Sequence, residues 1–172
     1  MTILNVRMLY DCYECYPLNG RDLEGKTVVC VGCDYGNSPV YFRLHGAKKV
    51  IGYERDKQRV KILKANLSRE SWFEFRGTWN AEYPDADVFQ MDIDGGEAIL
   101  DAKQLKKYEL WFVALHTLNR EEQRRWGTPN DTMHLAPALE VLGGTKVHYN
   151  GLDETIYRGW SIPRKEPERD PC

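Results

Sequence analysis

Short apolar runs recur along the chain, and they alternate with segments whose apolar residues repeat at helical spacing. The first run, Lys26–Val31, is apolar at nearly every position, as expected for a parallel strand that is buried on both faces. Later runs repeat this pattern, and together they predict five strands, at residues 26–31, 49–53, 72–75, 87–93 and 110–115. The pattern therefore indicates a sheet that lies inside the protein.

Amphipathic segments lie between these strands. A helix is predicted at 37–45, where Gly46 ends it, and a second one at 57–68, where Asp56 is a good capping residue. The remaining helical segments are a leading helix, two longer segments and one short turn, at residues 3–16, 97–107, 132–142 and 121–125. Proline suits the first turn of a helix, so Pro137 predicts a kink or a later start in the segment that contains it.

This order of elements predicts an α/β protein, a Rossmann-like three-layer sandwich with a seven-stranded, mostly parallel sheet. The last two strands, at 146–149 and 155–160, form a C-terminal antiparallel hairpin. Only about ten residues separate the third strand from the fourth, near the lower limit for a parallel crossover, so the helix there is reduced to a turn or lost. We expect one domain over 1–162 and a disordered, charged, proline-rich tail at 163–172.

The composition is that of an ordinary soluble globular protein: of 172 residues, 42% are hydrophobic and 29% are charged. The formal net charge of −2 argues against a broad nucleic-acid-binding surface, although it is compatible with a local basic patch. No apolar run reaches the ~20 residues that span a membrane, and the first residues lack the order of a signal peptide. We expect a cytoplasmic protein without a membrane partner, and a homo-oligomer stays open.

Two CxxC pairs, Cys12 with Cys15 and Cys30 with Cys33, are separated by fourteen residues, just outside the spacing of a zinc ribbon. Cys30 lies inside the apolar run VVCVG, where a free cysteine packs as a small hydrophobic residue. We therefore predict no metal site. A local Cys12–Cys15 disulfide is a lesser alternative, because the cytosol keeps thiols reduced.

Residues 28–54 have the order strand, glycine loop, helix, strand and acid. Gly32 and Gly36 bracket the loop, and glycines let the backbone approach a ligand without a Cβ in the way. Glu54 stands about twenty residues further on, at a strand end, where its carboxylate can accept hydrogen bonds from both hydroxyls of a ribose. This order predicts a nucleotide-like ligand. The alternative for Glu54 is a surface acid paired with the basic residues that follow it.

The loop segment VGCDYGNSPVYF, residues 31–42, resembles the first motif of the FkbM branch of class I S-adenosylmethionine (SAM) methyltransferases. The resemblance implies that SAM is the cofactor and that its methionine part lies among the loop residues Gly32, Cys33, Asp34, Gly36 and Asn37. Asp34 would contact the ammonium of SAM; alternatively, Asp34 and Asn37 only cap the next helix. Many family members carry an acid at the position of Cys30, and this chain does not. The pattern GxxxG lacks the third glycine of the dinucleotide fingerprint, which argues against NAD.

A second segment, QMDIDGGEAIL at residues 90–100, resembles the FkbM sequence K-[IM]-D-x-E-G-x-E, with Gln90 at the lysine position and Asp94 replacing the glutamate. Three acids within six residues repel one another, and at least one could have a raised pKa. Asp92 could act as a general base on a substrate hydroxyl, contact the cofactor or bind a cation. Alternatively, Asp94 and Glu97 only interact favourably with the start of the helix that follows.

His116 ends the apolar run LWFVALH, at the sheet edge where doubly wound proteins bind ligands. The family often has a histidine there, which implies a base or a residue that orients the substrate; alternatively, backbone groups satisfy its ring. Trp79 or Tyr83 could cover the adenine ring, although such aromatic residues more often belong to the core.

The resemblance covers residues 26–116 and implies a SAM-dependent methyltransferase that methylates the hydroxyl of a small molecule, for example a sugar, with Asp92 and His116 as catalytic residues. After its predicted fourth strand, the chain contains no (D/N)PP(Y/F/W) segment; such a segment is typical of enzymes that methylate the nitrogen of bases and amides. The acid missing at Cys30 and the short middle of the chain keep open a SAM-binding or Rossmann-like interaction module without catalysis. An NAD-type oxidoreductase is a third alternative.

Overall fold

The computed structural model describes residues 12, 15–117, 132–149 and 154–160. The helix predicted at 3–16 lies almost entirely outside these residues, and so do the turn predicted at 121–125 and the tail at 163–172. Within the described ranges, no helix combines the length and the apolar composition that crossing a membrane requires.

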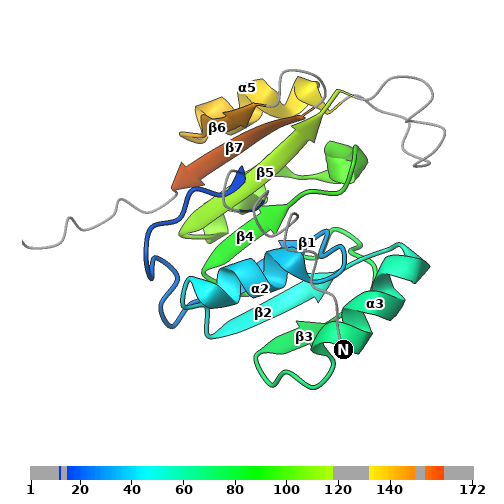
Figure 1. Ribbon diagram of the computed structural model, residues 1–172. Helices are drawn as coiled ribbons and strands as arrows, with labels where there is room; N and C mark the ends of the chain where they lie inside the picture. Colours follow the sequence, from blue (N-terminus) through cyan, green and yellow to red (C-terminus); the bar gives the residue numbers. More distant parts are fainter. Residues whose placement is uncertain (1–11, 13–14, 118–131, 150–153, 161–172) are drawn as a thin grey trace, which may run out of the picture.

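A seven-stranded sheet forms the centre of the described part of the chain, in the order β3-β2-β1-β4-β5-β7-β6 (Figure 1). Its strands are β1 (Thr27–Val31), β2 (Lys49–Tyr53), β3 (Phe73–Phe75), β4 (Val88–Met91), β5 (Leu110–His116), β6 (Thr145–Tyr149) and β7 (Glu154–Trp160). The first five pair in parallel, whereas β7 runs antiparallel to both β5 and β6. The predicted fold class, including the C-terminal hairpin, is confirmed.

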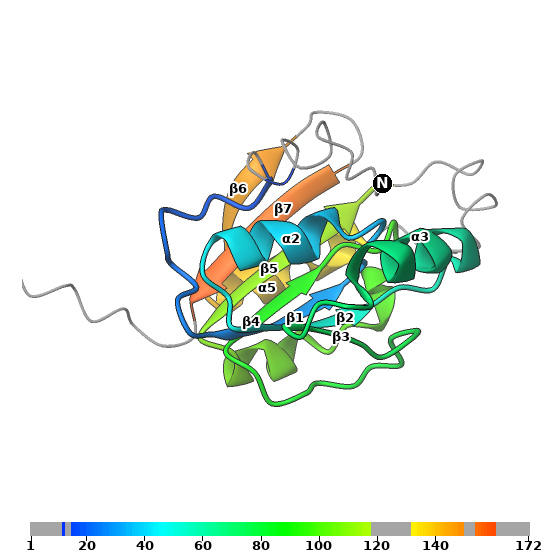
Figure 2. The ribbon, with the colours of Figure 1, turned by 60° about the horizontal axis from the view of Figure 1, so that its bottom comes forward.

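Alternate residues of the central strands belong to two hydrophobic clusters, one on each face of the sheet. In β1, Val28 and Cys30 belong to the cluster under α2 (Asn37–Leu44) and α3 (Lys57–Leu67), and Val29 belongs to the opposite cluster. Figure 2 shows α2 and α3 together on one face of the sheet. Fully burying a valine side chain stabilises a protein by about 1.5–3 kcal/mol, so a strand that is buried on both faces anchors the three-layer sandwich.

The opposite face is covered by shorter elements than expected. In place of one helix over 97–107 there are two 3₁₀ helices, η1 (Gly96–Ile99) and η2 (Ala102–Lys107). The predicted continuous helix is therefore wrong. The chain is extended at Leu100, with φ −68° and ψ 123°, and the Asp101 side chain caps η2. This break turns Leu100 into the core, where it is 6% exposed, whereas Ile99 is 58% exposed.

Two irregularities expected from the sequence are confirmed. The connection between β3 and β4 contains no helix. After the 3₁₀ turn η3 (Met133–Leu135), helix α5 starts at Ala136, which places Pro137 in its first turn, where proline has no hydrogen bond to break.

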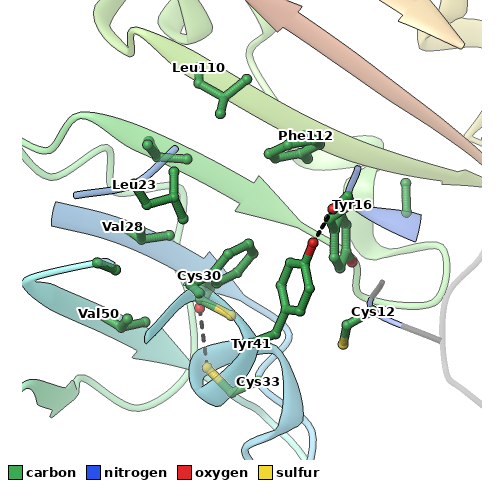
Figure 3. Packing of buried hydrophobic residues seen from close by; sticks show 14 of the residues in the cluster. Cys12, Tyr16, Leu23, Val28, Cys30, Cys33, Tyr41, Val50, Leu110 and Phe112 are labelled. Atoms are coloured by element: carbon green, nitrogen blue, oxygen red, sulfur yellow. Dashed lines mark hydrogen bonds between the residues drawn. The ribbon is translucent and has the colours of Figure 1, made fainter. Parts of the chain in front are cut away.

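Tyr16 ties the chain that precedes β1 to the centre of the sheet. Its ring is 2% exposed and packs edge-on against Phe112 of β5, with centroids 5.4 Å apart. The hydroxyl of Tyr41, from α2, donates to the backbone carbonyl of Tyr16, as Figure 3 shows. These contacts hold the Tyr16 hydroxyl close to the carboxyl ends of β4 and β5.

Candidate functional site

Two cavities open where the carboxyl ends of β1, β2 and β4 meet. The first cavity, of about 590 Å³, lies beside Glu54 and Trp79. The second cavity, of about 260 Å³, lies beside Asn37, Tyr16 and Glu154. Both volumes together suit a ligand of cofactor size with a smaller molecule beside it. The residues that line both cavities are Gly32, Arg59, Asp92 and Asp94.

Gly32 is required where β1 and β4 end side by side. Its φ is +90°, and a Cβ there would lie 1.8 Å from the carbonyl oxygen of Asp92. The sequence predicted this glycine for a close approach to a ligand, and the structure adds the neighbouring strand as a reason. Gly36, with φ +109°, seats the loop against α3, because a Cβ there would lie 3.1 Å from Leu67. Gly36 is not among the residues that line either cavity.

Glu54 is a buried acid that organises the loops around it. One of its oxygens accepts from the backbone N–H of Asp34 at 2.9 Å, and the other accepts from those of Arg55 and Asp56, at 2.8 Å and 2.9 Å. It is 7% exposed and lines the first cavity. The alternative of a surface acid paired with basic side chains therefore does not describe its surroundings. Each carboxylate oxygen has two lone pairs, so Glu54 keeps capacity for a ligand hydroxyl.

Arg59, from α3, joins the glycine loop to the acidic segment after β4. Its Nε lies 3.3 Å from Asp34 Oδ1, and its Nη1 lies 3.6 Å from Asp94 Oδ2. Both acids have left-handed backbones, with φ of 49° and 52°. Burial raises the pKa of Asp34, and the Arg59 guanidinium opposes that rise. Sequence reasoning did not identify Arg59, because it lies on a helix with no motif and reaches both loops only in the folded chain.

Two residues that line the second cavity carry buried polar atoms without partners. The second oxygen of Asp34 and both side-chain heteroatoms of Asn37 make no hydrogen bond within the described residues, and Asn37 is only 2% exposed. Leaving such a group unpaired costs about 1–3 kcal/mol, so an arrangement of this kind is typical of a site that a polar ligand completes. A carboxylate oxygen and an amide are chemically suited to the ammonium and carboxylate of an amino acid. The residues present therefore fit the methionine part of SAM.

The other predicted contacts are divided between cavity and core. Cys33 is fully buried and its thiol donates to the Cys30 carbonyl at 3.3 Å, so its side chain packs in the core, away from both cavities (Figure 3). Trp79 lines the first cavity, next to Tyr53 and Glu54. Tyr83 is not among the lining residues, and its hydroxyl accepts from the backbone N–H of Asp101.

Asp92 and His116 lie together at the ends of β4 and β5, within a group of carboxylates. His116 Nε2 is 3.6 Å from Asp92 Oδ1 and 3.6 Å from Glu154 Oε2, while its Nδ1 is 3.2 Å from Glu97 Oε1. Glu97 is held in turn by the backbone N–H groups of Ile93 and Gly95, at 2.7 Å and 2.9 Å. The 3.2 Å contact is electrostatic, because Nδ1 lacks a well-aligned hydrogen bond.

This arrangement raises the pKa of both predicted catalytic groups, which favours the neutral form of Asp92 and the charged form of His116. Burial raises the pKa of Asp92 to about 7, the charge of His116 opposes the rise, and Glu154 adds to it. Burial alone would lower the pKa of His116, but contacts with Glu154, Glu97 and Asp92 outweigh it and raise that pKa to about 11. Near neutral pH, His116 is therefore a cation, while Asp92 can both release and accept a proton, as a general base must.

Tyr16 and Gln90 complete the surroundings of Asp92. The Tyr16 hydroxyl donates to Asp92 Oδ2 at 3.0 Å and accepts from Gln90 Nε2 at 3.0 Å. The sequence did not reveal Tyr16 or Glu154 as site residues, because they come from segments outside the recognised motifs. Their places follow only from how those segments pack on β4 and β5.

Two groups of side chains have a spacing that could suit a cation. The ligating atoms of Asp92, His116 and Glu154 lie within 4.8 Å of one another, and so do those of Cys15, His148 and Glu154. In the first group, the imidazolium of His116 already supplies a positive charge between the carboxylates, so we assign no metal ligand there.

The CxxC pairs do not converge on a shared site. Cys30 lies in β1 and is fully buried, as predicted. No disulfide joins Cys12 and Cys15, so the alternative of a local disulfide is wrong. Cys12 Sγ is 3.8 Å from Ser38 Oγ, whereas Cys15 Sγ is 3.9 Å from Glu154 Oε1, so the two thiols point to different neighbours.

No family model matches the chain, so the FkbM branch stays a prediction. The fold of this chain matches that of a SAM-dependent methyltransferase from Mesorhizobium loti with a TM-score of 0.59 and 12% sequence identity, and the match covers 88% of this chain and 95% of that one. An O-methyltransferase from Bacillus cereus in complex with S-adenosylhomocysteine matches with a TM-score of 0.57 and 15% identity, covering 93% of this chain and 92% of that one. Fibrillarin from Aeropyrum pernix with bound SAM matches with a TM-score of 0.56 and 13% identity, covering 78% of this chain and 66% of that one. These similarities show the class I SAM methyltransferase fold.

Two sequence relatives come from viruses of Sulfolobus islandicus. Uncharacterized protein 158B of rod-shaped virus 1 is 39% identical over 100 residues, which cover 55% of this chain and 63% of that protein. Uncharacterized protein 65 of the filamentous virus is 39% identical over 111 residues, which cover 60% of this chain and 69% of that protein. A ribosomal protein L11 methyltransferase from Aliivibrio fischeri is 46% identical over 52 residues, only 18% of its length. The chain therefore belongs to the same protein family as protein 65 of the Sulfolobus islandicus filamentous virus.

Proposed function

We propose that the protein is a SAM-dependent methyltransferase that acts on the hydroxyl of a small molecule. The observation that carries this proposal is the junction of the two cavities at Gly32 and Asp92. A cofactor that spans the junction would have its adenosine in the first cavity and its amino acid end in the second. An acceptor would then enter beside Asp92.

Several residues would hold the cofactor. Glu54 would accept a hydrogen bond from a ribose hydroxyl, and Trp79 would cover the adenine in the first cavity. Asp34 and Asn37 would bind the amino acid end with their unpartnered polar atoms. The stretch that is 46% identical to a ribosomal protein L11 methyltransferase also supports methyl-transfer chemistry.

When bound, SAM supplies an electrophilic methyl group on its sulfonium. The protein's own part is to orient the acceptor and to remove the proton of its hydroxyl. Asp92 is the base in this proposal, because it lines both cavities and its side chain is 30% exposed. His116 is a positioning residue, since its ring holds Asp92 Oδ1 at one side.

The charges around the second cavity favour a neutral or cationic acceptor. Its lining includes the acids Asp34, Asp92, Asp94 and Glu154, with Arg59 as the only basic side chain among the described residues that line it. A phosphate backbone would be repelled by this excess of carboxylates. The second cavity, of about 260 Å³, would also hold the amino acid end of SAM, so the space left beside Asp92 suits only a small acceptor.

Transfer of a labelled methyl group tests the proposal. The protein is incubated with methyl-labelled SAM and a panel of sugars and other small hydroxyl compounds, and label in the acceptor is measured. We expect transfer to at least one member of the panel and its loss with Asp92→Asn. SAM binding without transfer across the panel would contradict the proposal and favour a SAM-binding module without catalysis.

A further inference from the structure

Tyr16 is the meeting point of a buried chain of hydrogen bonds that ends on Asp92. Gln90 is fully buried in β4, two residues before Asp92 and on the same face, and its Nε2 donates to the Tyr16 oxygen at 3.0 Å. The Tyr16 hydroxyl then donates to Asp92 Oδ2 at 3.0 Å. Tyr16 itself is 2% exposed, so water competes little for these bonds.

The polarity of this chain follows from the chemistry of its members. A phenol has one proton to donate, and the amide N–H of Gln90 is a donor, so the Tyr16 oxygen accepts from Gln90 and its proton goes to Asp92. If the Gln90 amide were turned over, its oxygen would compete for that proton and the carboxylate would face a lone pair of Tyr16. Burial, and then the charge of Asp92, raise the pKa of Tyr16 well above the ordinary value, so it keeps its proton.

We propose that Tyr16 is a positioning residue of the active site, which favours the ionised form of the Asp92 carboxylate and turns its Oδ1 toward His116 and the cavity junction. The catalytic consequence rests on the proposed function, but the coupling between Tyr16 and Asp92 does not. The segment that precedes β1 thereby becomes part of the site, although it lies outside every recognised motif.

The groups that face Asp92 make the contribution of Tyr16 measurable. His116 of β5 favours the ionised form of Asp92, while Glu154 of β7 and the nearby Asp94 and Glu97 disfavour it. Tyr16 differs from these groups because it is neutral, and its hydroxyl donates a hydrogen bond to Asp92. A donor to a carboxylate stabilises its charged form, so the Tyr16 hydroxyl lowers the pKa of Asp92 from the value that it would otherwise have.

Tyr16→Phe removes the hydroxyl and keeps the ring that packs on Phe112. The pKa of Asp92 is measured by carbon NMR of labelled aspartate carboxyls, assigned with Asp92→Asn, in the parent and in the variant. We expect the pKa of Asp92 to rise by about one unit in Tyr16→Phe. The acid limb of the pH–rate profile would then move up equally, with roughly tenfold slower turnover on that limb and recovery at high pH.

Two further variants keep the test sharp. Tyr108→Phe removes the hydroxyl of a fully buried tyrosine that donates to the Pro84 carbonyl, on the opposite face, and should leave the pKa of Asp92 unchanged. Gln90→Met removes the donor to Tyr16 but leaves the Tyr16 proton on Asp92, so we expect a clearly smaller rise than in Tyr16→Phe. An unchanged Asp92 pKa in folded Tyr16→Phe, or an equal rise with Gln90→Met, would overturn the proposal.

The NMR measurement separates this inference from the proposed function. A raised pKa in Tyr16→Phe supports the coupling even if the parent protein transfers no methyl group to any acceptor. Methyl transfer by the parent, together with an unshifted Asp92, would leave the proposed function intact and refute the role of Tyr16.

Discussion

The carboxylate of Glu54 accepts a hydrogen bond from the backbone N–H of Asp34 at 2.9 Å, across 20 residues of sequence. The end of β2 thereby fixes the conformation of the glycine loop after β1. Asp34 has a left-handed backbone, with φ 49°, that only a firmly held loop maintains at low cost. One buried acid therefore both shapes the loop and borders the first cavity, where a ribose would bind.

Replacing Glu54 should weaken cofactor binding. Glu54→Ala removes a charge-assisted hydrogen bond to the ribose with a net contribution of about 1.5–3 kcal/mol, so we expect at least a tenfold loss in SAM affinity. Isothermal titration calorimetry measures it. The control is Glu70→Ala, which removes an exposed acid outside both cavities. A folded Glu54→Ala protein that binds SAM like the parent would refute the ribose contact.

Arg59 should also be needed for SAM binding, because it holds Asp34 and Asp94 together across the cavity junction. Arg59→Met keeps the length of the side chain, removes the charge and leaves two carboxylates to repel each other. We expect a loss of SAM affinity of about tenfold. Lys61→Met, an exposed change on the same helix, is the matched control. Equal SAM affinities of both variants and the parent would show that the contacts of Arg59 with Asp34 and Asp94 do not contribute to SAM binding.

Asp92→Asn should separate catalysis from binding. The amide keeps the size of the side chain but cannot accept the acceptor's proton, so we expect turnover to fall by ~10²-fold or more, with SAM affinity within a few-fold of the parent. His116→Ala should give a smaller loss, because that ring positions Asp92. Steady-state rates and calorimetry are measured together, with Asp101→Asn as an exposed control outside the site. Full activity of Asp92→Asn would place the base elsewhere.

Gly36→Ala tests the seat of the glycine loop on α3. A Cβ at Gly36 has a strained φ and would also press on Leu67, whereas one at Gly25, with φ +73°, would meet nothing within 4 Å. Both substitutions carry backbone strain, which is larger at the wider φ of Gly36, so their difference reports this extra strain together with the packing against Leu67. We expect Gly36→Ala to lower the free energy of unfolding by about 1–3 kcal/mol more than Gly25→Ala does, measured by urea denaturation. Equal losses would mean that α3 moves aside without cost.

The strands could be predicted from the sequence, because runs such as VVCVG are apolar on both faces and the register of a buried parallel strand leaves few alternatives. The segment 97–107 could not, since its apolar spacing also suits a helix. There, the burial of Leu100 in an extended conformation outweighs helical continuity. This is a tertiary effect that local spacing does not contain.

The candidate site divides in the same way. Gly32, Glu54 and Asp92 lie at strand ends that the motifs mark, and they border the cavities. Arg59 and Tyr16 reach the site through packing of a helix and of the segment before β1, and no spacing in the sequence connects them to it.

The central claim is that the two cavities bind SAM, and calorimetric titration of the protein with SAM, S-adenosylhomocysteine and NAD tests it most directly. The pattern GxxxG, the buried Glu54 and the unpartnered atoms of Asn37 all suit a nucleoside joined to an amino acid. We predict one site per chain for SAM and for S-adenosylhomocysteine, and no heat from NAD under the same conditions. Binding of NAD, with none of either SAM-type ligand, would contradict this account.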